Sequence, residues 1–151
     1  QMIHTCFLPG TPPGQITLDY HDQGAPFVRD HADIPISLSH SHDLTAAACS
    51  TSPELTLGVD LEKITHTPDQ HFLNTAFTQR EIDSLDNDAQ LIFKQWTIKE
   101  AYLKYIKKGF NESLHHVEIL SEGIHHGGEL MQTTIFSTTL ENDYMLSLVY
   151  D

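Results

Sequence analysis

The segment GVDLEKI, residues 58–64, decides the fold, because apolar and acidic side chains alternate along it. A period of two is typical of a β-strand, in which successive side chains point to opposite faces. Val59 and Leu61 then point into a core, while Asp60 and Glu62 stand together on the other face. Carboxylates this close repel each other unless a cation neutralises them, and ligands that are all oxygen suit a hard ion such as Mg²⁺.

The longest predicted helix covers residues 88–108 and contains the segment WTIKEAYLK. Asp88 can cap its start, and Gly109 is a plausible stop after its last turn. Apolar side chains form a broad stripe along it, in which we expect Trp96 to be the buried anchor.

Trp96, Glu100 and Lys104 recur every four residues and therefore lie along one side of this helix. If the helix crosses the strand there, Glu100 meets the two carboxylates of the strand, and Lys99 and Lys104 flank the same place. Three carboxylates with two ammonium groups suit Mg²⁺ and a diphosphate, whose developing charge they neutralise. The residues alone predict a site for Mg²⁺ and phosphate.

Further strands and helices surround this pair of segments. We expect strands at residues 15–20, 34–40, 44–50, 55–64, 115–120, 131–139 and 143–151, and short helices at 68–77 and 78–86. The prediction is an α+β fold in which an antiparallel sheet packs against one long helix.

Charge and length limit the classes of function. The chain of 151 residues is long enough for one domain with its own core. Its formal net charge of -13 opposes non-specific binding to nucleic acid and to anionic membranes. Its first residues, QMIHTCFLPG, lack the order of a secretory signal, and no segment is apolar enough to span a membrane, so we expect a cytoplasmic protein.

Four elements together resemble a known family. GVDLEKI and W-T-x-K-E-A-x-x-K resemble the two signature motifs of the 4'-phosphopantetheinyl transferases, in the surfactin-synthetase-activating subfamily. The segment ISLSHSHDLTAAACS, residues 36–50, is similar to its SHS segment, and FTQRE, residues 77–81, to its F-x-x-x-E element. The elements follow one another in the family's order.

The resemblance implies a 4'-phosphopantetheinyl transferase-like fold and Mg²⁺-dependent transfer. The phosphopantetheine arm of coenzyme A would move to a serine of an acyl or peptidyl carrier protein, with release of 3',5'-ADP. By position, Asp60, Glu62 and Glu100 would bind Mg²⁺ together with the diphosphate of coenzyme A. Lys104 would neutralise or protonate the leaving phosphate, and Glu62 would belong to the catalytic residues with it. Phosphoryl-type transfer is mostly positioning and neutralisation of charge, which these residues offer.

Three more roles follow from the resemblance. Lys99 and His40 would contact phosphates of coenzyme A. Glu81 is a candidate general base for the serine hydroxyl, but a Thr78-x-x-Glu81 capping box explains this glutamate equally well. Both interpretations of Glu81 stay open at this point.

The sequence also departs from the family. The subfamily carries Gly-Lys-Pro upstream of the SHS segment, whereas this chain has Gly24-Ala25-Pro26 and so lacks one basic contact. Members are longer at the N-terminus, so we expect one domain over residues 1–151, with 1–50 as the remnant of an N-terminal subdomain and 51–151 as the C-terminal subdomain with the metal site. A homo-oligomer in which a second copy completes the cleft fits this shortening. The alternative function is that of a degenerate or truncated, non-catalytic relative that binds carrier proteins or is structural.

Overall fold

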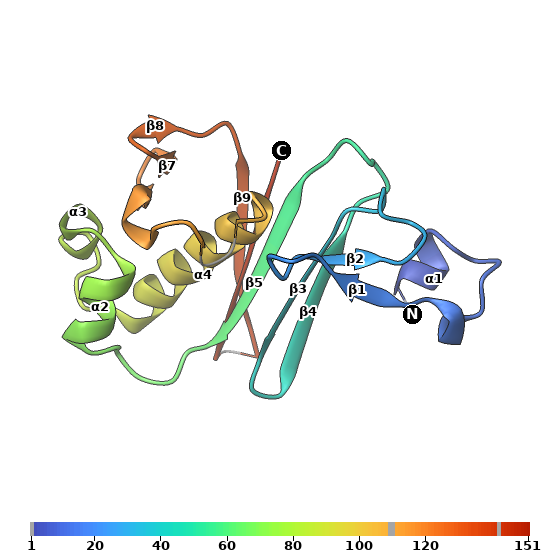
Figure 1. The fold of residues 1–151 in the computed structure, drawn as a ribbon. Coiled ribbons are helices and arrows are strands. Elements are labelled where there is room, and N and C mark those ends of the chain that lie inside the picture. The colour runs from blue at the N-terminus through green and yellow to red at the C-terminus, as the bar shows by residue number, and fades with distance from the viewer. Residues whose placement is uncertain (1, 109–110, 142) are drawn as a thin grey trace.

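The computed structural model describes residues 2–108, 111–141 and 143–151 (Figure 1). Its strands are β1 Leu18–Tyr20, β2 Pro26–Val28, β3 Ile36–Ser41, β4 Leu44–Cys49, β5 Leu57–Lys63, β6 Val117–Leu120, β7 Gly123–His126, β8 Glu129–Leu130, β9 Thr134–Leu140 and β10 Tyr144–Tyr150. Its α-helices are α1 Met2–Cys6, α2 Gln70–Ala76, α3 Gln79–Ile82 and α4 Ala89–Tyr105. The predicted α+β class is confirmed.

The central sheet is antiparallel, with the strand order β5-β10-β9, and α4 packs across one of its faces (Figure 1). The hairpin of β3 and β4 lies beside β5, on the side away from α2 and α3. Val59 and Leu61 of β5 belong to a core cluster with Ala46 and Tyr144. The alternate residues of β5 therefore face α4, so both faces of this strand are covered.

Gly58 sets how closely α4 approaches β5. A Cβ atom at Gly58 would collide with the backbone carbonyl of Ala101 and the backbone N–H of Tyr105, both on α4. Only a residue without a side chain allows strand and helix backbones to come this near. The glycine of GVDLEKI thereby places the helix over the two carboxylates that follow it.

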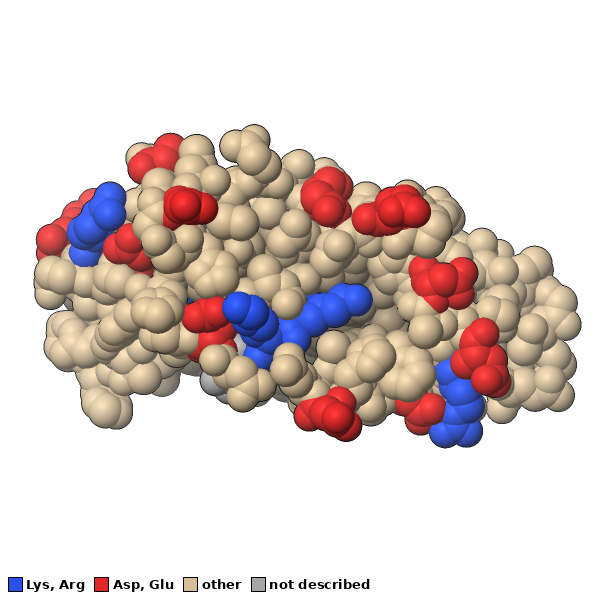
Figure 2. All heavy atoms as spheres, turned by 45° about the horizontal axis from the view of Figure 1, so that its top comes forward, with Lys and Arg blue, Asp and Glu red and all other residues tan. Residues whose placement is uncertain are grey.

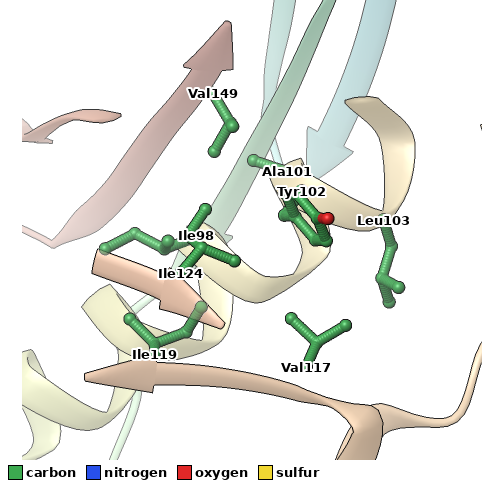
Figure 3. Packing of buried hydrophobic residues seen from close by; sticks show 8 residues of the cluster. All are labelled: Ile98, Ala101, Tyr102, Leu103, Val117, Ile119, Ile124 and Val149. Carbon is green, nitrogen blue, oxygen red and sulfur yellow. The ribbon is translucent and has the colours of Figure 1, made fainter. Parts of the chain in front are cut away.

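The largest core cluster joins the other side of α4 to β6, β7 and β10 (Figure 3). Its buried members are Ile98, Ala101, Tyr102, Leu103, Val117, Ile119, Ile124 and Val149. With this cluster on one side and β5 on another, α4 is fixed in position along most of its length.

The caps of the helices agree with the sequence. Asp88 accepts hydrogen bonds from the first backbone N–H groups of α4, as predicted, and the helix ends at Tyr105 rather than at residue 108. The expected stop at Gly109 lies outside the described residues. In the part of the chain that is described, no helix is both long and apolar enough to cross a lipid bilayer.

Three short strands and one helix were not expected. These elements are α1, β2, β7 and β8. Strands of two to four residues are too short to show a period, and β7 and β8 are held by their partners, since Ile124 pairs with Ile119 of β6 and Glu129 pairs with His126. The turn between β7 and β8 uses Gly127 and Gly128, both with positive φ, as the Gly-Gly pair indicates.

Candidate active site

Asp60 and Glu62 lie on the face of β5 that α4 covers. Ser147 of β10 is the partner of Asp60 in the sheet, and only 4% of the surface of Asp60 is exposed. Glu62 is half-buried. The strand pairing and the helix above thus take two carboxylates out of water.

Serine hydroxyl groups of β3 accept hydrogen bonds from the backbone of β5, as the carbonyl groups of a neighbouring strand would in a sheet. Three alternate serines of β3 accept hydrogen bonds from three alternate backbone N–H groups of β5. The pairs are Val59 N to Ser37 Oγ at 3.0 Å, Leu61 N to Ser39 Oγ at 3.2 Å and Lys63 N to Ser41 Oγ at 3.1 Å. We call these three serines the serine ladder.

Two serines of the ladder also hold the carboxylates. Ser39 Oγ donates to Asp60 Oδ1 at 2.8 Å, and Ser41 Oγ donates to Glu62 Oε2 at 3.0 Å. Each of these hydroxyls accepts from the backbone of β5 and donates to the side chain of the residue before, so it fixes both. Ser37 makes the backbone contact only.

Lys104 and Glu100 bring α4 to the same place. Lys104 Nζ donates to Asp60 Oδ1 at 2.8 Å and to the carbonyl oxygen of Val59 at 3.1 Å. Asp60 Oδ2 and Glu100 Oε1 are buried and have no hydrogen-bond partner. A buried carboxylate oxygen without a partner is costly, and such atoms mark a place that a ligand can fill.

Burial dominates the electrostatics of the three carboxyl groups. It raises the pKa of Asp60 above its ordinary value, more than the contacts from Lys104 and Ser39 lower it. Burial and the charge of Asp60 raise the pKa of Glu62 as well. Glu100 changes most, because burial and then the charge of Asp60 raise its pKa to about 7. These side chains repel one another as anions, and a nearby cation would relieve the repulsion.

The donor chemistry of these residues fits a hard cation, but the three carboxylates do not form a ligand shell as they stand. Among the residues described, no three Asp, Glu, His or Cys side chains are grouped closely enough to hold a metal ion. Lys104 and Ser39 occupy Asp60 Oδ1, and Ser41 occupies one oxygen of Glu62. The buried, unpaired oxygens of Asp60 and Glu100 remain as possible ligand atoms, and oxygen is the ligand atom that Mg²⁺ prefers.

Lys99 and Glu81 form a separate, fully buried ion pair. Lys99 Nζ lies 2.8 Å from Glu81 Oε2, and neither side chain has any exposed surface. The ammonium group also donates to the carbonyl oxygens of Ala76 and Leu114, and Glu81 accepts from the backbone N–H groups of Thr78 and Ile119. The pair therefore connects α2, α3, α4 and β6.

This burial bears on the roles that the sequence suggested for both residues. Because neither side chain has exposed surface, the geometry gives no support to the phosphate contact of Lys99 or to the base role of Glu81, and both roles stay predictions. The capping box of Thr78 and Glu81, the other interpretation left open, is present in full. The T-x-x-E pattern of Thr78 and Glu81 was the sequence signal for this capping box.

Breaking the buried pair should destabilise the fold. Lys99→Met leaves the Glu81 carboxylate buried without its cation, which is expected to cost about 3 kcal/mol in the free energy of unfolding measured in urea. Arg80→Met is the matched control, because Arg80 pairs with Glu118 at 3.4 Å while 67% exposed. That exposed pair should contribute less than about 1 kcal/mol. Equal stabilities of the two variants would contradict the assignment.

A cavity of about 330 Å³ opens next to Glu100 and Lys104. Its walls come from the turn before β2, including Ala25, from Leu38 of β3, and from the end of α4, including Lys107. Figure 2 shows basic side chains gathered at the middle of one face of the molecule. Clustered cations beside an open cavity can hold an anionic ligand although the whole protein is acidic.

Neither His40 nor Trp96 lines this cavity. His40 is exposed on β3, on the strand face that it shares with Ile36 and Leu38, but it does not line the cavity. Trp96 is half-buried against Phe72 and Phe77, with ring centres 5.2 and 6.3 Å apart. Trp96 lowers the pKa of Glu62, against the larger effect of burial.

Comparisons with known proteins match this chain to one family. The family model described as the 4'-phosphopantetheinyl transferase superfamily matches residues 56–148, which include β5, α4 and β10. The chain is 34% identical over 119 residues to 4'-phosphopantetheinyl transferase HetI of Nostoc sp. (strain PCC 7120 / SAG 25.82 / UTEX 2576), covering 73% of this chain and 49% of HetI. It is 31% identical over 93 residues to 4'-phosphopantetheinyl transferase gsp of Aneurinibacillus migulanus, covering 59% of this chain and 37% of gsp. The chain thus spans half or less of the length of these curated relatives.

Proposed function

The chain belongs to the 4'-phosphopantetheinyl transferase superfamily, and from this premise we propose that it transfers the 4'-phosphopantetheine group of coenzyme A to a serine of an acyl or peptidyl carrier protein. The reaction releases 3',5'-ADP and depends on Mg²⁺, and the four sequence elements favour the surfactin-synthetase-activating subfamily. The observation that carries the proposal is the set of buried carboxylates on β5 and α4, with Lys104 among them, at the wall of a cavity. A cytoplasmic location remains a prediction.

Asp60, Glu62 and Glu100 are the proposed ligands of Mg²⁺. The unpaired oxygens of Asp60 and Glu100 support this assignment, and Glu62 stands beside Asp60 on the same strand face. When bound, the ion would neutralise charge on the diphosphate of coenzyme A. Burial raises the pKa of each carboxyl, so a further cation close by would favour its anionic form.

Lys104 supplies the mobile positive charge of the site. Its ammonium group is 30% exposed and reaches the cavity from α4, while it contacts Asp60. We propose that it moves its hydrogen bond from Asp60 to the leaving phosphate and donates to the oxygen on which charge develops. Glu62 is the remaining candidate for accepting the proton of the serine hydroxyl, since Glu81 is sealed in its ion pair.

The test is the intact mass of a carrier protein incubated with this chain, coenzyme A and MgCl₂. A gain of one phosphopantetheine group that EDTA prevents is the expected result. A folded sample that modifies none of several acyl and peptidyl carriers would contradict the transferase and favour the non-catalytic relative that binds carriers. The assay is run at several protein concentrations, because a higher concentration favours association with a second copy of the chain.

The serine ladder provides a sharper test within the site. Ser39→Ala removes the hydrogen bond to Asp60 Oδ1, whereas Ser37→Ala removes only a contact to the backbone of β5. Both variants should lose about 1 to 2 kcal/mol of stability. Only Ser39→Ala should also raise the Mg²⁺ concentration needed for half-maximal transfer, because Asp60 then loses one of the two side-chain contacts, from Ser39 and Lys104, that orient its carboxylate. If both variants required the same Mg²⁺ concentration, the serine ladder would contribute to stability only and not to the proposed metal site.

A further inference from the structure

Lys107 stands immediately after α4 in a backbone conformation that glycine usually adopts. Its φ is +55°, in the left-handed region, where a residue with a Cβ is disfavoured. Ile106 is the C-cap of the helix, so Lys107 occupies the position after it, at which glycine is the most frequent residue. A lysine at this position therefore gives up some backbone stability.

The side chain at this position borders the cavity of the proposed site. Lys107 lines the cavity of about 330 Å³ together with Glu100 and Lys104. It also lines a second, adjoining hollow that contains Tyr20 and Phe27. Ala25 borders both spaces, and it stands where the resembling family carries a lysine. Lys107 thus places a positive charge at the cavity wall that also contains Ala25, where this chain lacks the family's lysine.

No ion pair among the described residues neutralises the charge of Lys107. Most basic side chains have an acidic partner within 4 Å in the described residues. These pairs are Arg29–Asp19, Lys63–Asp143, Arg80–Glu118, Lys99–Glu81, Lys104–Asp60 and Lys108–Glu112. Within the described ranges, no such pair involves Lys94 or Lys107, and only Lys107 of these two lines the cavity beside Glu100. Because the chain has a net charge of -13, an anion is bound most favourably where a lysine without an acidic partner borders a cavity.

We propose that Lys107 and Lys104 form an anion subsite that takes a phosphate group of coenzyme A. The subsite rests on the proposed function, because the same cavity would receive the nucleotide. Coenzyme A offers two such groups, the diphosphate and the ribose 3'-phosphate, and both suit an ammonium group. Lys107 then supplies from the end of α4 the basic contact that Ala25 does not supply.

The left-handed backbone gives a test that separates binding from folding. Lys107→Gly removes the ammonium group but restores the residue that this conformation favours, so its melting temperature should equal or exceed that of the unchanged chain. Affinity for coenzyme A, measured by calorimetry with MgCl₂ present, should fall about tenfold or more, as for one lost charge-assisted hydrogen bond. The loss should shrink as the salt concentration rises, because the group is exposed.

Two comparisons complete the experiment. Lys94→Gln removes the other unpaired lysine, away from this cavity, and should bind coenzyme A like the unchanged chain. Dephospho-coenzyme A identifies the group: a loss seen only with coenzyme A assigns Lys107 to the 3'-phosphate, and a loss seen with both ligands assigns it to the diphosphate. If the unchanged chain binds coenzyme A and Lys107→Gly binds it equally well, the subsite is overturned and the proposed function stands. If the unchanged chain binds neither ligand, both are overturned.

Discussion

Glu100→Gln is expected to lower Mg²⁺-dependent transfer at least about a hundredfold while making the protein more stable at pH 8 in EDTA. The loss of activity follows from replacing a proposed ligand of the ion by a neutral amide. Opposite effects on activity and on stability are typical of a charge that a site maintains for function. An exposed glutamate on β8 offers the control, since Glu129→Gln should change neither quantity.

The gain in stability depends on pH in a direction that can be derived. The pKa of Glu100 is raised from an ordinary value of 4.5 to about 7 in the folded protein. A carboxyl group with a raised pKa favours the folded state below the unfolded pKa, and this contribution is lost as pH rises through the folded pKa. Glutamine does not titrate. Glu100→Gln should therefore match the unchanged chain near pH 4.5 and exceed it by about 1 to 3 kcal/mol at pH 8.

Urea unfolding at several pH values in EDTA measures this difference. A constant difference between the two proteins from pH 4.5 to pH 8 would contradict the burial of Glu100 as the cause. Retention of normal transfer by the variant would remove Glu100 from the proposed metal site.

Gly58→Ala is expected to destabilise the protein by at least about 4 kcal/mol, because α4 has to move away from β5. The new Cβ meets backbone atoms of Ala101 and Tyr105, which cannot rotate aside as a flexible side chain would. The displaced helix also carries Glu100 and Lys104 away from the strand, so any folded fraction should lose activity. Gly14→Ala is the control, since no atom lies within 4 Å of a Cβ there. Thermal melting measures both, and a Gly58→Ala variant that melts like the control would contradict the close approach of helix and strand.

The alternation in GVDLEKI and the period of the following helix predicted the central part of this fold and which residues face each other. Asp60 and Glu62 do share the face of β5 that α4 covers, and Glu100 and Lys104 do lie near them, because residues four apart share a helix face. Neither the period of the strand nor that of the helix indicates how deeply the contact between β5 and α4 is buried. That depth depends on Gly58, whose role becomes visible only when strand and helix are placed together.

Lys99 shows where the sequence argument failed. It precedes Glu100 directly, so its side chain leaves the helix about 100° away from that of Glu100 and cannot flank the same place as Lys104. It points to α2 and α3, where Glu81 is turned inward by its capping box. The serine ladder lies outside what the sequence argument predicted. A period of two places the three serines on one strand face, but their contacts to β5 depend on the packing of two strands that belong to different sheets.

The most direct test of the metal site at Asp60 and Glu100 is the broadening of amide NMR signals by Mn²⁺, which takes oxygen ligands as Mg²⁺ does. Substoichiometric Mn²⁺ should broaden the amides of Val59, Leu61 and Ala101 first, and excess Mg²⁺ should restore them. An alternative contact for Mn²⁺ is Glu112, whose oxygens lie 3.3 Å from His116 Nδ1 and 3.2 Å from His126 Nε2. Broadening centred on these histidines, with the β5 amides unchanged, would contradict the site proposed here.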